Sequence, residues 1–128
     1  MSKKMGFLSP EAINAGVDAI ITFSSLYYGH EVTREDLFSK KRSQPVVLVR
    51  AVLSKLLHDS GMSFLQIGKV IGRDHTSAMN LVERFSEIVP EEDADDILEF
   101  VSGRMARIET DRRKALMKRL SEMEKVEL

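Results

Sequence analysis

Five consecutive side chains that can form hydrogen bonds follow a glycine in the stretch GRDHTSAMNLVERF, residues 72–85. They are Arg73, Asp74, His75, Thr76 and Ser77. One interpretation is capping, because an aspartate before a helix accepts hydrogen bonds from the free N–H groups of the first turn. Capping explains Asp74 but not its four neighbours, since one cap suffices and threonine is a mediocre helix former.

The other interpretation is that these side chains face nucleic acid. Two helices joined by a short turn with a glycine form a helix-turn-helix, whose second helix enters the major groove of DNA with its N-terminal residues at the base edges. Hydroxyl groups serve there as donors or acceptors, and a threonine methyl packs on thymine. Ser63 and Gln66 have capping-box spacing and begin the preceding helix, which Gly72 ends.

Two more helices are predicted before residue 40. The tripeptide SPE at 9–11 combines a hydroxyl N-cap, a proline at the first helical position and an acid in the first turn. Apolar residues then recur at helical spacing until Gly29 ends the segment. The capping sequence TRED at 33–36 begins a short helix that holds Leu37 and Phe38.

A loop and two further helices complete this part of the chain. Residues 39–44, SKKRSQ, are polar and basic without apolar periodicity, and they are predicted to form a loop. Pro45 opens a helix with one apolar side that ends at residues 59–61. The helix capped by Asp74 is predicted to run to about Ile88, before a proline. No segment alternates like a strand, so we expect an all-α fold.

Residues 90–128 have a different composition. Six acids and no base occur at 91–99, and seven bases against two acids at 104–119, an order that suits the dipole of one long helix. An apolar stripe runs along it, formed by Ile97, Val101, Met105 and Ile108 and then by Leu116, Leu120 and Met123. The stripe predicts burial, either against the rest of the chain or against a second copy or other protein. We therefore divide the chain into a helix-turn-helix unit, 1–89, and a charged C-terminal helix, 90–128.

The net charge of −1 hides an uneven distribution. Residues 34–85 have nine basic and five acidic side chains, whereas residues 86–128 have eight basic and twelve acidic ones. A basic segment inside a neutral chain points to a polyanionic partner for that segment. On charge alone, a solvated basic surface is an equally good explanation.

Several classes of function lack support in the sequence. There is no cysteine, which suits a reducing compartment, and His30, His58 and His75 have no shared ligand spacing, so no metal site is predicted. The phosphate-binding pattern G-x-x-x-x-G-K-[ST] is missing, so we expect no nucleotide and no other cofactor. No nucleophile and base stand out as a pair, and an enzyme is not expected.

The termini and the hydropathy favour a cytosolic protein. No apolar run approaches the roughly 20 residues of a membrane span. Lys3 and Lys4 are basic, but the polar residues 9–11 follow too soon for the apolar core of a signal peptide. We therefore expect no membrane association.

The stretch IGKVIGRDHTSAMNLVERF resembles the signature of the C-terminal DNA-binding domain of the bacterial replication initiator DnaA. That signature has isoleucine-glycine, a few residues, and then glycine-arginine-aspartate-histidine-threonine-threonine. The likeness extends to the tyrosine pair at 27–28, to SKKRS at 39–43 and to SFLQIG at 63–68, and it covers about residues 14–88. It implies an all-α helix-turn-helix bundle of the DnaA C-terminal or Trp-repressor-like type, to which this chain adds a C-terminal helix.

The resemblance also implies roles for single residues in the recognition helix. Asp74, His75, Thr76 and Ser77 match the family's base-reading positions, although Ser77 stands where the family has a second threonine. Arg73 matches an arginine that contacts the DNA backbone.

Other implied contacts lie outside that turn. Arg42 matches the basic-loop arginine that enters the minor groove, with Lys40 and Lys41 beside it, and A·T-rich minor grooves attract such arginines. Asn80 stands one turn further along the recognition helix, where the family often has a histidine that approaches DNA. Arg50, a basic residue in the helix after the loop, is included among the predicted DNA contacts.

The resemblance thus implies sequence-specific binding of double-stranded DNA through the major and minor grooves, in the regulation of replication or transcription. A stand-alone module of this kind could belong to a phage or mobile element. The alternative is a helical protein–protein adaptor with vestigial DNA binding, whose C-terminal helix holds the partner. A continuous positive face that exposes Arg42, Arg73 and His75 would favour DNA, and an apolar or acidic one would favour the adaptor.

Overall fold

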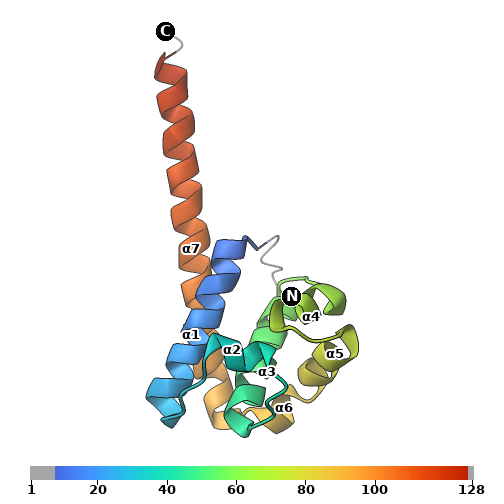
Figure 1. The fold of residues 1–128 in the computed structure, drawn as a ribbon. Helices are drawn as coiled ribbons and strands as arrows, with labels where there is room; N and C mark the ends of the chain where they lie inside the picture. The colour runs from blue at the N-terminus through green and yellow to red at the C-terminus, as the bar shows by residue number, and fades with distance from the viewer. Residues whose placement is uncertain (1–7, 127–128) are drawn as a thin grey trace.

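The computed structural model describes residues 8–126, which form helices joined by short turns and contain no strand (Figure 1). The predicted all-α class is confirmed. Lys3 and Lys4, on which the signal-peptide prediction rests, lie outside these described residues. Within the described part of the chain, no helix has the length and apolarity needed to cross a membrane. The helices are α1 (Pro10–Tyr28), α2 (Arg34–Phe38), α3 (Gln44–Asp59), α4 (Phe64–Ile71), α5 (His75–Glu83), α6 (Phe85–Ile88) and α7 (Glu91–Val126).

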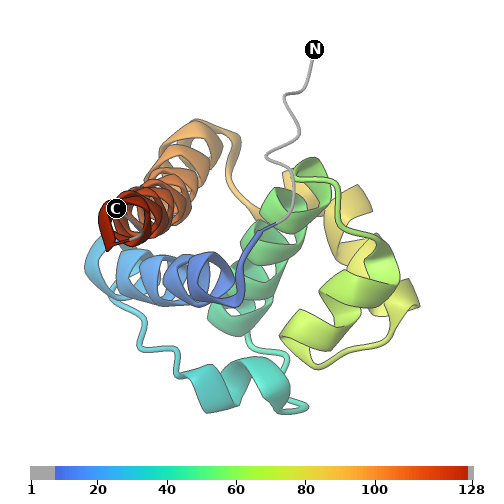
Figure 2. The same cartoon turned by 90° about the horizontal axis from the view of Figure 1, so that it is seen from above.

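Helix α3 lies between two pairs of helices. α1 and α7 pack along each other on one side of it, and α4 and α5 lie on the other side (Figure 2). Its apolar side chains Val49, Val52 and Leu57 have no solvent exposure. A change in α3 therefore affects both the α1–α7 pair and the helix-turn-helix.

The first part of α7 belongs to the same hydrophobic core as the helix-turn-helix. Ile97, Val101 and Met105 are buried there. Gly16 of α1 allows close packing, because a Cβ atom at this position would lie 2.7 Å from the sulfur of Met105. The core therefore crosses the boundary that the sequence suggested at residue 89.

Two tyrosine hydroxyl groups tie the end of α1 to the start of α7. The Tyr27 hydroxyl donates to Asp93 Oδ1 at 2.7 Å, and the Tyr28 hydroxyl donates to Asp93 Oδ2 at 2.8 Å. The pKa of Tyr28 is raised above its usual value, mainly by burial and to a smaller extent by the hydrogen bond to Asp93. The rings of Phe23 and Phe100 pack beside this cluster with their centroids 5.6 Å apart.

Two helix boundaries differ from the prediction. α3 begins at Gln44, one residue earlier than expected. The predicted helix from Asp74 to about Ile88 is divided at Arg84, whose φ and ψ of −97° and 11° end α5 before α6 begins. The break brings Phe85 of α6 into the core, where it is 8% exposed. Periodicity alone does not reveal such a break, because the apolar pattern continues through it.

Candidate nucleic-acid interface

The two helices of the helix-turn-helix begin with the predicted caps. At α4, Ser63 Oγ accepts the Gln66 N–H at 3.2 Å, and Gln66 Oε1 accepts the Ser63 N–H at 3.0 Å. At α5, Asp74 Oδ1 accepts the Ser77 N–H at 2.8 Å. This bond from the Ser77 backbone lowers the pKa of Asp74 below its usual value. Asp74 is therefore an ionised acceptor at neutral pH, and its cap fixes the first turn of α5.

Two glycines explain the shape of the turn between α4 and α5. Gly72 has a φ of 68°, the left-handed conformation that commonly ends helices. Gly68 lies under the turn, where a Cβ atom would come within 2.5 Å of the Arg73 carbonyl oxygen and 3.0 Å of that of Asp74. The Arg73 N–H donates to the Gly68 carbonyl at 2.8 Å. The two glycines, four residues apart, thus allow a sharp turn, after which the first residues of α5 are exposed.

A buried arginine fixes the basic loop between α2 and α3. Arg50 is 3% exposed. Its Nε donates to the Leu37 carbonyl at 2.9 Å, its Nη1 to that of Lys41 at 2.7 Å, and its Nη2 to those of Asp36 and Ser39 at 2.9 and 2.8 Å. Arg50 was predicted to contact DNA. The structure instead places it beneath the loop, where its N–H groups hold backbone carbonyls.

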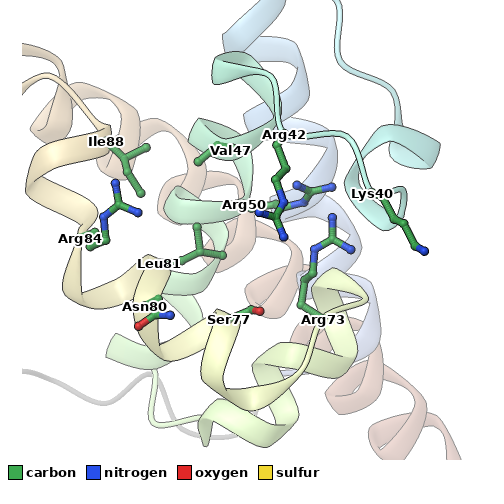
Figure 3. A pocket seen from close by; sticks show the side chains of 10 residues that line it. All are labelled: Lys40, Arg42, Val47, Arg50, Arg73, Ser77, Asn80, Leu81, Arg84 and Ile88. Atoms are coloured by element: carbon green, nitrogen blue, oxygen red, sulfur yellow. The ribbon is translucent and has the colours of Figure 1, made fainter.

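A second arginine connects this loop to the recognition helix. The Arg73 guanidinium donates to the Ser39 carbonyl, which Arg50 also holds. The pKa of Arg50 is lowered, mainly by its burial and to a smaller extent by the positive charges of Arg73 and Arg42. Three guanidinium groups thus gather at one place (Figure 3). Such a concentration of positive charge attracts anions.

A hollow of about 620 Å³ lies between the basic loop and α5. Ser77 and Asn80 line it from α5, and Arg84 lies toward the end away from the arginine cluster (Figure 3). Sequence reasoning missed Arg84. The available signal is its spacing, since it follows Asn80 by four residues and Ser77 by seven and so shares their face. The hollow is lined by Lys40, Arg42, Val47, Arg50, Arg73, Ser77, Asn80, Leu81, Arg84 and Ile88.

The remaining predicted residues lie outside the hollow. His75 and Thr76 are exposed in the first turn of α5, with His75 Nε2 3.5 Å from Thr76 Oγ1. Asp74 caps that turn, as described above. Lys41 is exposed, and its Nζ lies 3.8 Å from Asp36 Oδ1. Six of the ten predicted residues therefore line one hollow, and three of the others form the exposed start of α5.

A capped helix-turn-helix beside a fixed basic loop defines this chain as an all-α protein of the DNA-binding helix-turn-helix class. The model of the bacterial DnaA protein helix-turn-helix family matches residues 17–84, more than half of the 128 residues. The chain therefore belongs to that family, as the signature predicted. DNA binding is the general function of this family, which is not an enzyme family. No curated protein matches the chain, and no solved structure matches it.

Proposed function

We propose that the protein binds double-stranded DNA sequence-specifically and thereby regulates replication or transcription. In this proposal the first turn of α5 enters the major groove and the loop 39–43 reaches the adjacent minor groove. The observation that carries it is the joint anchoring of the two segments, because Arg50 and Arg73 both hold the Ser39 carbonyl. A loop and a helix joined in this way present one surface rather than two independent ones.

The proposed contacts divide into two kinds. Arg73 and Arg84 stand around the hollow, where charge-assisted bonds to phosphates would fix the position of the protein on DNA. His75, Thr76 and Ser77 lie in the first turn of α5, from which hydroxyl and imidazole groups reach base edges. Arg42 is exposed on the loop and suits the negative potential of a narrow minor groove.

The distribution of charge supports DNA over a protein adaptor at this face. Arg42 and His75 are exposed and Arg73 is half-buried. The hollow beside Arg42 and Arg73 is lined by basic, apolar and neutral polar side chains, without a carboxylate. An acidic protein surface could bind the same positive charge. Exposed short polar side chains at the start of a capped helix next to a glycine turn, however, are the feature by which a helix-turn-helix reads DNA bases.

The test begins with selection of bound fragments from random duplex DNA, followed by titrations on the selected and a scrambled duplex at several salt concentrations. Thr76→Ala should weaken binding to the selected duplex roughly 5- to 150-fold, the equivalent of about 1–3 kcal/mol, and leave the salt dependence unchanged. Arg73→Ala should weaken binding to both duplexes and reduce the slope of log affinity against log salt by about one unit.

Arg107→Ala is the matched control, because Arg107 is an exposed arginine on α7, outside the hollow. It should change neither the affinity nor the slope by more than a small amount. Indistinguishable behaviour of Thr76→Ala and Arg73→Ala on both duplexes would contradict the recognition-helix assignment. A wild-type chain that binds no duplex in a salt-sensitive manner would leave the adaptor as the better function.

A further inference from the structure

The C-terminal part of α7 extends away from the rest of the molecule (Figure 1). All side chains described from residue 110 to residue 124 are exposed, and no other described element covers them. Four are large and apolar: Leu116, Met117, Leu120 and Met123 are 54%, 66%, 48% and 63% exposed. Large apolar side chains that lie together on an exposed surface commonly mark a protein–protein interaction site.

The uncovered stripe continues a face that is covered further back along the same helix. Met105 packs against α1, and α1 begins at Pro10, directly after the N-cap Ser9. The Ser9 N–H donates to Glu109 Oε1 at 2.9 Å, so the packing of α1 against α7 ends beside Glu109. Leu116, about three turns after Met105, lies on the same helical face. Among the described residues, one helix covers the first part of this face and none covers the second.

We propose that residues 110–126 pair in antiparallel fashion with the same segment of a second copy of this chain. Leu116, Leu120 and Met123 follow each other at steps of four and three residues, the spacing of a coiled-coil seam. In a pair centred near residue 118, Leu116 of each copy lies opposite Leu120 of the other. The end of the partner helix then reaches Thr110, next to the place where α1 begins. The uncovered segment is thus as long as such a pair requires.

The charges along this segment favour the antiparallel order. Its first part carries Arg112, Arg113 and Lys114, and its last part carries Glu122 and Glu124. Arg113 continues the seam spacing three residues before Leu116, so antiparallel pairing places it opposite Met123 of the other copy and next to that copy's Glu124. Parallel pairing would instead align the three basic residues with their own copies, and like charges across a helix pair are destabilising.

The small size of the seam predicts a weak dimer. Few side chains are available on each copy, so the buried area falls below the roughly 1,200 Å² of stable interfaces. We expect the monomer–dimer equilibrium in the range of about 1 µM to about 1 mM. This inference does not depend on DNA binding, because none of these residues belongs to the proposed interface with DNA.

The first experiment compares two substitutions at neighbouring exposed positions of the full chain. Leu120→Glu places a charge in the seam, whereas Ser121→Glu places the same charge on the opposite face of the helix. Sedimentation velocity across the concentration range above should show a concentration-dependent mass for the wild type and for Ser121→Glu. Leu120→Glu should remain monomeric, with an unchanged melting temperature at low concentration. A monomeric wild type throughout, or equal behaviour of the two variants, overturns the proposal.

The second experiment tests the antiparallel order. Arg113→Glu and Glu124→Arg should each weaken association several-fold, because each places like charges across the pair. The double variant exchanges the two charges and should restore association to near the wild-type level. A double variant as weak as the single ones contradicts the antiparallel arrangement. DNA titrations of Leu120→Glu on a single-site duplex should match the wild type, which separates this inference from the proposed function.

Discussion

The molecule has two concentrations of arginine and lysine side chains, and their surroundings differ. In the first, Arg42, Arg50 and Arg73 gather beside a hollow, on a backbone held by hydrogen bonds and capped helices. In the second, Arg112 and Arg113 begin a basic stretch of a helix whose described side chains are all exposed beyond residue 110. One region is concave and supported from beneath, whereas the other is a single convex helix.

The difference shows why basic composition alone does not identify a DNA-binding surface. Successive side chains on a single helix point in different directions, so few of them reach one ligand together. In the first region the turn, the loop and α5 bring side chains from distant parts of the chain to one surface. A ligand with a regular row of charges, such as duplex DNA, engages several of them at once. The predictions below test this contrast, beginning with the largest expected effect.

Arg50→Leu should destabilise the protein by about 3 kcal/mol, because four backbone carbonyls each lose a hydrogen bond that leucine cannot replace. The Ser39 carbonyl keeps the bond from Arg73, and the Asp36 carbonyl keeps those from Ser39. Urea unfolding measures this loss. Lys118→Leu removes a positive charge from the exposed part of α7 and should change the urea midpoint very little. Equal midpoints for Arg50→Leu and the wild type would show that the loop does not depend on its buried guanidinium.

Two double variants, each of which replaces two arginines by glutamine, compare how strongly the two regions bind DNA. Arg42→Gln with Arg73→Gln should weaken binding to a single-site duplex about 100-fold and reduce the salt slope by about two units. Arg112→Gln with Arg113→Gln removes the same number of charges and should leave both quantities nearly unchanged at protein concentrations below about 1 µM. Titrations by fluorescence anisotropy measure both. Similar losses in the two double variants would mean that total charge, rather than shape, governs binding.

Two glycine-to-alanine substitutions compare how closely the backbone is packed in the helix-turn-helix and in α7. Gly68→Ala should destabilise by about 2 kcal/mol, because its Cβ would meet backbone oxygens of the turn at 2.5 and 3.0 Å. Gly103→Ala, on the open side of α7, meets no atom within 4 Å and should stabilise by up to about 1 kcal/mol. Thermal unfolding of both variants gives the signs. A stabilised Gly68→Ala would show that the turn adjusts easily and is not a fixed support.

The smallest expected effect concerns the attachment of the first part of α7. The raised pKa of Tyr28 means that the folded state favours the protonated phenol. This contribution to stability is fully present below the unfolded pKa of about 10 and is lost as the pH rises through the folded pKa. Wild-type stability should therefore fall above about pH 10, and Tyr28→Phe should show a shallower fall. Urea midpoints between about pH 8 and pH 11 measure this, and parallel curves would contradict it.

Local signals in the sequence were sufficient for most helices of the fold. Ser63 and Asp74 cap the two helices, and Gly72 ends the first of them, as the hydrogen-bonding side chains and the conformational freedom of glycine predicted. These features depend on neighbours within a few residues, which the sequence displays directly. Family membership followed from the same short stretch.

Features that depend on distant contacts were not predictable in the same way. Arg50 lies four residues after Val46, on the buried face of α3, but its carbonyl partners come from a different segment. Its charge therefore suggested an external ligand rather than an internal one. The division of the apolar stripe into a covered and an uncovered part depends on where α1 begins beside Glu109, which the pattern along α7 does not encode.

The extension of α7 also determines how far apart two copies could act. Residues 110–126 span roughly 25 Å at 1.5 Å per residue. Two copies paired along this length would hold their α1 helices at opposite ends, with each α5 further out on the far side of α3. The half-sites of compact helix-turn-helix dimers lie about 34 Å apart on one face of DNA. A pair joined at its tips would have a longer reach and would suit two distant sites, or two separate duplexes brought side by side, better than a short palindrome.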